Sequence, residues 1–204
     1  MRGVDRVKLV WLAMVASVML AGTASVAEVG GAKHQWKVNQ HENTRFLGFS
    51  TSAPLLSKTT KVEVVFYADP TPSKNDVHST LGFDFFIEGT GTLTAFNFEA
   101  FEGPDARPGR AMQVTITRKG KPPLILKLVP SGSSPSETNF VFGVADVSRA
   151  ATSDAKTILK ALADDAETMH IAVTDTRKAA VKIELTIPVA EKQAEFKALL
   201  TGLK

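Results

Sequence analysis

The four histidines of this chain are the first candidates for metal or acid–base chemistry, and their spacing does not support a metal site. They are His34, His41, His78 and His170. A zinc-binding helix carries a second histidine four residues after the first, with a glutamate between them. His41 is followed by Glu42, but Arg45 stands where the second histidine would be needed. We interpret all four as surface or structural residues and predict no metal.

Two short glycine-containing segments resemble catalytic or cofactor motifs only in part. Gly48–Ser52 places Ser50 as in a nucleophile elbow, but the closing glycine is replaced by Ser52 and no helix follows. Gly89–Gly91 lacks the third glycine and the helix of a dinucleotide-binding loop. We interpret the first as a strand end and the second as a turn. No catalytic residue and no cofactor is predicted from them.

Acidic residues gather after the helix expected near the C-terminal end. Asp164, Asp165 and Glu167 would oppose the helix dipole if they lay at a helix C-terminus. Carboxylates in a turn can hold calcium together with backbone oxygens. The alternative is a solvated turn that ends the helix, and the sequence leaves both interpretations open.

Basic residues concentrate between a Pro/Gly-rich loop and the next expected hairpin turn. Such a cluster can contact an anionic partner such as lipid headgroups or glycans, although solvated hairpin ends have the same pattern. The residues of this candidate contact surface are Arg107, Arg110, Arg118, Lys119 and Lys121.

The aromatic composition favours a packed core over a stacking surface. The chain has 12 Phe against two Trp and one Tyr. Surfaces that bind sugars or nucleic acids favour aromatic side chains with a polar edge. An apolar pocket for a fatty ligand remains an alternative use of these phenylalanines.

The first 27 residues have the order of a secretion signal. Arg2, Arg6 and Lys8 precede the apolar run 9–21, which is short for a membrane span, and Ser25–Ala27 offers small residues for cleavage. We expect residues 1–27 to be removed and 28–204 to form one exported, unanchored domain in the periplasm or outside the cell. That domain would have 21 Lys and Arg against 20 Asp and Glu, so no nucleic-acid partner is expected. The chain contains no cysteine, which excludes disulfides and thiolate catalysis.

The middle of the chain predicts about nine short strands separated by turns, the pattern of an antiparallel β-sandwich. A hairpin is expected at Glu88–Gly91, with Phe96 and Phe98 on its returning strand, and a second at Lys119–Lys121. The Ser/Gly/Pro segment Ser131–Ser136 is expected to be an exposed loop.

The last fifty residues predict helix, strand, turn, strand and helix. Ser153 is suited to cap a helix whose apolar residues recur at helical spacing up to Leu162. Asp175–Lys178 is the polar break between two strands, and Pro188 is expected in the first turn of the last helix. Val181, Ile183, Leu185 and Ile187 share one face of the second strand, which we expect to be buried.

This order resembles the invasion-associated locus B family of exported bacterial proteins. The resemblance rests on a secretion signal, a strand opened by Trp36-Lys37-Val38, a β-rich middle, and the closing helix, strand, strand and helix. The closing elements are Asp154–Ala163, the strand after it, Val181–Ile187 and Glu191–Leu200. The resemblance implies a periplasmic β-sandwich with a role at the envelope or in host contact, and it supplies no catalytic residue.

The chain departs from that family at two places. Asn39 stands where the family has its first cysteine, and 188–190 replaces the family's glycine–phenylalanine pair. Taken together, the sequence predicts an exported, non-enzymatic binding or accessory protein of the envelope, reaching an envelope or host protein or an anionic surface. A carrier of a small lipophilic ligand and a hydrolase with an unrecognised carboxylate site are the alternatives.

The signal segment gives a direct test. Expression in a bacterial host should yield exported protein that begins at Glu28, because the basic, apolar and small-residue regions all precede that position. Intact-mass measurement of the periplasmic fraction reads the new N-terminus. Full-length protein confined to the cytoplasm would contradict the prediction.

Overall fold

A computed structural model describes residues 25–29, 32–41, 44–69, 80–147 and 153–201. Within these ranges the chain is mainly β, with two antiparallel sheets and two α-helices. Helix α2 (Asp154–Asp164) precedes the last two strands, and helix α3 (Gln193–Leu200) follows them. Neither helix has the length and hydropathy needed to cross a membrane.

The larger sheet has seven strands in the order β1-β2-β3-β4-β5-β9-β8. Consecutive strands from β1 to β5 pair antiparallel, and β9 then returns along β5. The strands of the larger sheet are β1 (Ser25–Val29), β2 (Ala32–His41), β3 (Thr44–Leu55), β4 (Lys58–Ala68), β5 (Thr80–Glu88), β8 (Ser131–Ser136) and β9 (Asn139–Val147).

The smaller sheet has four strands in the order β11-β10-β6-β7. Alternation predicts its faces correctly for Ile183, Leu185 and Ile187, which are buried while the residues between them are exposed. Val181, expected on the same buried face, lies before β11 and is only half-buried. The predicted hairpin at Lys119–Lys121 is confirmed as the β6–β7 turn. The strands of the smaller sheet are β6 (Met112–Arg118), β7 (Lys121–Leu128), β10 (Ala166–Thr174) and β11 (Lys182–Pro188).

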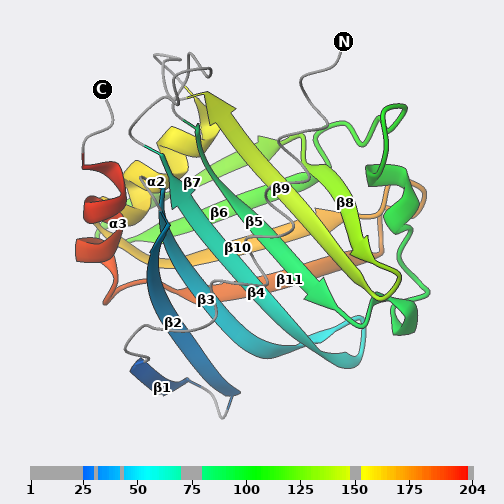
Figure 1. Ribbon diagram of the computed structural model, residues 1–204, viewed down its shortest axis with the longest axis horizontal. Helices are drawn as coiled ribbons and strands as arrows, with labels where there is room; N and C mark the ends of the chain where they lie inside the picture. Colours follow the sequence, from blue (N-terminus) through cyan, green and yellow to red (C-terminus); the bar gives the residue numbers. More distant parts are fainter. Residues whose placement is uncertain (1–24, 30–31, 42–43, 70–79, 148–152, 202–204) are drawn as a thin grey trace.

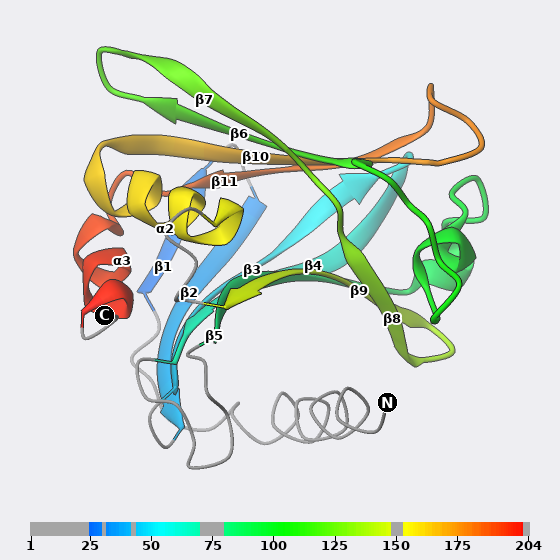
Figure 2. The ribbon, with the colours of Figure 1, turned by 90° about the horizontal axis from the view of Figure 1, so that it is seen from above.

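The two sheets form two layers whose strands cross, with the smaller sheet behind the larger one in Figure 1. Seen from above, the helices lie at one side between these layers (Figure 2). Helix α2 contacts β5 and β9 of the larger sheet and β6, β7 and β10 of the smaller one. Helix α3 contacts α2, β3 and β4. The helices therefore fill the space where the layers diverge.

One apolar core joins both sheets and both helices. Phe196 of α3 meets Trp36 at a ring-centroid distance of 6.2 Å and Phe66 at 5.0 Å, both edge to face. This geometry is the preferred one for aromatic pairs. The expectation that phenylalanines build the core is confirmed by Phe49, Phe66, Phe83, Phe85, Phe101, Phe140, Phe142 and Phe196, which are all almost completely buried.

Helix α2 begins where the sequence predicts. The side chain of Ser153 accepts a hydrogen bond from the N–H of Lys156 at 3.0 Å. Asp146, near the end of β9, accepts from the N–H of Ala155 at 3.0 Å. Both bonds satisfy amide groups that have no partner inside the first turn. The helix start is thus fixed by its own cap and by the larger sheet.

The strand predicted for Phe96 and Phe98 was wrong. Gly89 adopts φ 69°, and two 3₁₀ turns follow, η1 (Thr90–Thr92) and η2 (Phe98–Phe101). Phe96 and Phe101 are buried, and Phe96 meets Phe142 of β9 edge to face. These side chains cover one end of the core, and that burial outweighs their preference for a strand.

Two further expectations need correction. Ser131–Ser136 is the edge strand β8, held by β9 through pairs such as Ser131 with Gly143. A Ser/Gly/Pro composition does not prevent pairing when a neighbouring strand presents a free edge. Pro188 is the last residue of β11, and α3 begins only at Gln193. Residues 1–24 of the expected signal lie outside the described residues, while Ser25–Ala27 belong to β1.

The buried face of β11 gives a stability test. Ile183→Ala should lower the free energy of unfolding by about 2–5 kcal/mol, since it removes a fully buried side chain and leaves a cavity. Lys182→Ala, on the exposed face of the same strand, should change it by less than about 0.5 kcal/mol. Chemical denaturation followed by circular dichroism measures both, and equal losses would contradict the assigned face.

Candidate functional site

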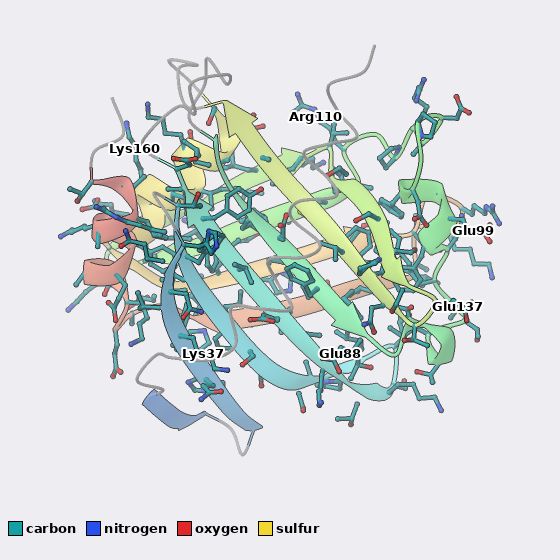
Figure 3. The ribbon with its side chains drawn as sticks, viewed as in Figure 1. Lys37, Glu88, Glu99, Arg110, Glu137 and Lys160 are labelled. Carbon is teal, nitrogen blue, oxygen red and sulfur yellow. The ribbon has the colours of Figure 1, made fainter. Side chains whose placement is uncertain are left out.

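The five basic residues predicted to form one contact surface lie in two groups. Arg107 and Arg110 precede β6, whereas Arg118 ends β6, and Lys119 and Lys121 lie in the turn and at the start of β7. Because β6 has seven residues, the groups are separated by about 20 Å along the strand. Figure 3 shows Arg110 to the right of helix α2, on whose C-terminal end the turn lies. The structure therefore places this charge at both ends of one hairpin.

Lys121 has a partner within the fold. Its Nζ lies 2.6 Å from Oδ2 of Asp165 and 3.3 Å from Oδ2 of Asp164. Hydrogen bonds to Asp165 and then to Asp164 raise the pKa of Lys121 above its ordinary value. The N–H of Lys119 also donates to the carbonyl of Asp165 at 3.0 Å. These contacts dock the hairpin turn on the C-terminal end of α2.

The acidic turn after α2 therefore holds a lysine ammonium between two of its carboxylates. Both carboxylate oxygens of Asp165 are shielded from solvent, and Lys121 supplies the neighbouring positive charge. The same cation offsets the unfavourable position of acids at a helix C-terminus. Across the described ranges, no three His, Cys, Asp or Glu side chains are arranged to hold a metal ion.

The described histidines lie apart from one another. His34 is buried on β2 with its ring 5.6 Å from that of Phe49, while His170 lies on β10 with Nε2 4.0 Å from Oε1 of Glu184. His41 ends β2, and His78 is outside the described residues. The first thus packs against the core and the second lies at the surface of the other sheet.

Asp175 lies in the polar segment between β10 and β11, and its side chain is buried and hydrogen-bonded. It accepts hydrogen bonds from the N–H groups of Arg177 at 2.7 Å, Lys178 at 3.0 Å and Asn97 at 2.6 Å. Burial alone would raise its pKa, but these three donors outweigh it and the pKa is lowered. Asp175 thereby ties the segment before η2 to the smaller sheet.

Asp84 was not predicted as a site residue, and its carboxyl lies on the outer face of the larger sheet. Asp84 of β5 stands between Val65 of β4 and Gly143 of β9 in the strand register. Its neighbours Phe83 and Phe85 point into the core. Asp84 is half-buried, although it belongs to the face of β5 that side-chain alternation predicts to be exposed to solvent.

Two glycines let polar side chains lie close to the sheet. A Cβ at Gly143 would come within 2.9 Å of Oδ1 of Asp84 and 3.0 Å of Oγ of Ser131. A Cβ at Gly82 would come within 2.2 Å of the Val144 carbonyl oxygen and 2.9 Å of Oη of Tyr67. Both approaches are closer than side chains tolerate, so the carboxyl and the phenol take up space that only glycine leaves open.

This position changes the acidity of both groups. Burial raises the pKa of Asp84 to about 7. Burial, followed by the Asp84 and Asp146 carboxylates, raises the pKa of Tyr67 well above its ordinary value. The pKa of Glu63 on β4 is also raised by burial, against an opposing effect of Lys37. Asp84 can therefore gain or lose a proton near neutral pH while Tyr67 keeps its proton.

The chemistry available at Asp84 is that of one titrating carboxyl beside a neutral phenol. Carboxylate-pair hydrolysis needs a second acid that is available to substrate or water. Asp146, the other acid that acts on Tyr67, already accepts the N–H of Ala155. Sequence reasoning missed Asp84 because its burial depends on Gly143, which is distant in the sequence. A lone acid between Phe83 and Phe85 was the only local signal.

Comparisons with protein-family models, with curated proteins and with solved structures find no match for this chain.

Titration of Asp84 predicts the pH dependence of an Asp84→Asn variant. A carboxyl whose folded pKa is raised binds its proton more tightly in the folded state, so it destabilises the fold as pH rises from about 4 to 7. The variant should gain stability relative to wild type by roughly 2–4 kcal/mol between pH 4 and pH 8. Urea denaturation at both pH values measures this difference. A difference that does not change with pH would contradict the raised pKa.

Proposed function

We propose that this chain is an exported, non-enzymatic binding protein of the bacterial envelope, built as a β-sandwich with two helices beside its last strand pair. The order of signal-like residues at positions 1–27 supports export. The resemblance to invasion-associated locus B proteins supports an envelope role. The two layers and their shared core support the sandwich.

The observation that carries the binding role is the exposed positive charge at the two ends of the β6–β7 hairpin. Arg107, Arg110 and Lys119 are exposed, whereas Lys121 is paired with acids of α2. With residues 28–204 almost neutral, attraction to an anionic partner has to come from such local charge. Near an anionic bilayer each basic residue contributes about 1 kcal/mol.

A hydrolase that uses Asp84 is the second candidate, favoured by the pKa of about 7 of that carboxyl. This hydrolase ranks below the binding function because Asp146, the second acid that it would need, already accepts a hydrogen bond at the start of α2. An Asp84→Asn variant that loses a hydrolytic activity present in wild type would reverse this order.

Removing three charges tests the binding role. The variant Arg107→Gln, Arg110→Gln, Lys119→Gln should bind vesicles of phosphatidylglycerol and phosphatidylethanolamine, or bacterial envelope extract, up to about 100-fold more weakly at low salt. Added salt should reduce the difference, because exposed charges are screened over about 8–10 Å. Vesicle co-sedimentation measures the affinity.

The matched control removes three exposed lysines elsewhere, Lys58, Lys182 and Lys197. It has the same net charge as the test variant, so a specific role of the hairpin predicts near wild-type binding for it. Equal weakening of both variants would reduce the effect to overall charge. Absence of wild-type binding at low salt would remove the proposal.

A further inference from the structure

Strand β7 is an edge of the smaller sheet. It pairs with β6 on one side, and within the described ranges no strand pairs with its other side. An unpaired edge offers a row of backbone N–H and C=O groups that another extended chain can bind. In Figure 2 this hairpin lies at the outside of the smaller sheet, above the helices.

The middle of this edge is apolar on both faces. Ile125 on the outer face is 55% exposed, and Val129, directly after the strand, is 60% exposed. Leu124 and Leu126 on the inner face are only half-buried against the core. A sheet edge usually carries charged side chains in place of such residues, so this edge is open to apolar contact.

The two ends of β7 are less available to a pairing strand than its middle. The guanidinium of Arg118 donates to the carbonyl of Pro122 through Nε at 3.1 Å and Nη2 at 2.6 Å. Pro122 and Pro123 have no N–H to offer a partner. At the other end, Nη1 of Arg110 lies 3.5 Å from the carbonyl of Lys127. Pairing is therefore confined to the short stretch that contains Leu124, Ile125 and Leu126.

The charged side chains around residues 124–126 of β7 favour one kind of partner strand. Lys127 is exposed on the strand itself, Lys119 on the adjoining turn and Arg110 before β6. A second copy of β7 would bring the same lysines and arginines against each other, and facing like charges destabilise strand pairs. An acidic strand would meet opposite charge at the end with Lys127 and Arg110 and an apolar residue in the middle, while Lys119 at the other end lies beside the pair of Lys121 with Asp165.

We propose that β7 binds an extended, acidic segment of a partner protein as an additional strand. The inference rests on the proposed binding function and specifies its partner as a protein segment with apolar residues at its centre and an acidic residue on either side of them. Backbone hydrogen bonds would supply much of the affinity, as in other strand additions, and side chains its selectivity. An apolar side chain of the segment would cover Ile125, and its acids would approach Lys127 and Lys119.

The probe is the synthetic peptide Glu-Val-Val-Val-Glu with both ends blocked, in which the central Val and both Glu share one face of the strand and the other two Val share the opposite face. Isothermal titration calorimetry with the full chain should show binding that weakens with salt. The same peptide with alternate backbone amides methylated should bind at least about tenfold more weakly, because it cannot complete the ladder. A peptide with Lys in place of Glu should not bind.

Two protein variants locate the site. Lys127→Glu should weaken peptide binding by about 5–10-fold, and Ile125→Thr should weaken it while keeping a β-branched side chain in the strand. The matched control is Lys182→Glu, which reverses another exposed lysine on β11, the opposite edge of the same sheet. Thermal melting confirms that each variant is folded.

The outcomes separate this inference from the function on which it rests. Weakened binding by Lys127→Glu but not by Lys182→Glu, together with sensitivity to backbone methylation, supports strand addition at β7. Equal binding of the methylated peptide, or no peptide binding while anionic vesicles are bound through Arg107, Arg110 and Lys119, overturns the inference and leaves the envelope-binding function standing. No binding of peptide, vesicles or envelope extract removes both.

Discussion

The placement of α2 between two sheets is the constraint on which the rest of the structure depends. Its buried residues include Ile158, Leu159 and Leu162, and it contacts strands of both layers. Each end of α2 is also held by a residue from one of the two sheets. Asp146 of the larger sheet binds the first turn, and Lys121 of the smaller sheet pairs with the acids at the last turn. One helix therefore fixes the two sheets relative to each other through its sides and through both ends.

Local patterns predicted most of the elements because side-chain alternation and capping act within a few residues. The buried face of β11 and the start of α2 at Ser153 follow from the sequence directly. The segment with Phe96 was predicted wrongly because aromatic residues favour strands in general, whereas here they close one end of a core built by distant strands. Ser131–Ser136 was missed because its pairing partner, β9, provides the order that its own composition lacks.

The candidate sites were predictable only in part, for a related reason. The sequence identified the basic residues but not their separation by the length of β6, nor the capture of Lys121 by Asp165 from α2. Asp84 carried almost no signal, because its acidity depends on how closely Gly143 lets it approach β9. In both cases the decisive partner comes from another part of the chain. Types of residue could be inferred locally, whereas their electrostatic state required the fold.

The strand order also sets when this protein can finish folding during its synthesis. β6 lies between β7 and β10, and β10 and β11 are made after all seven strands of the larger sheet. Until those last strands and both helices emerge, β5 and β6 lack their contacts with α2, and β6 lacks its neighbour β10. Contacts between segments so far apart in sequence close slowly, since the intervening loop must first be ordered. The two sheets therefore cannot be joined through α2 until about the final fifty residues of the chain have been made.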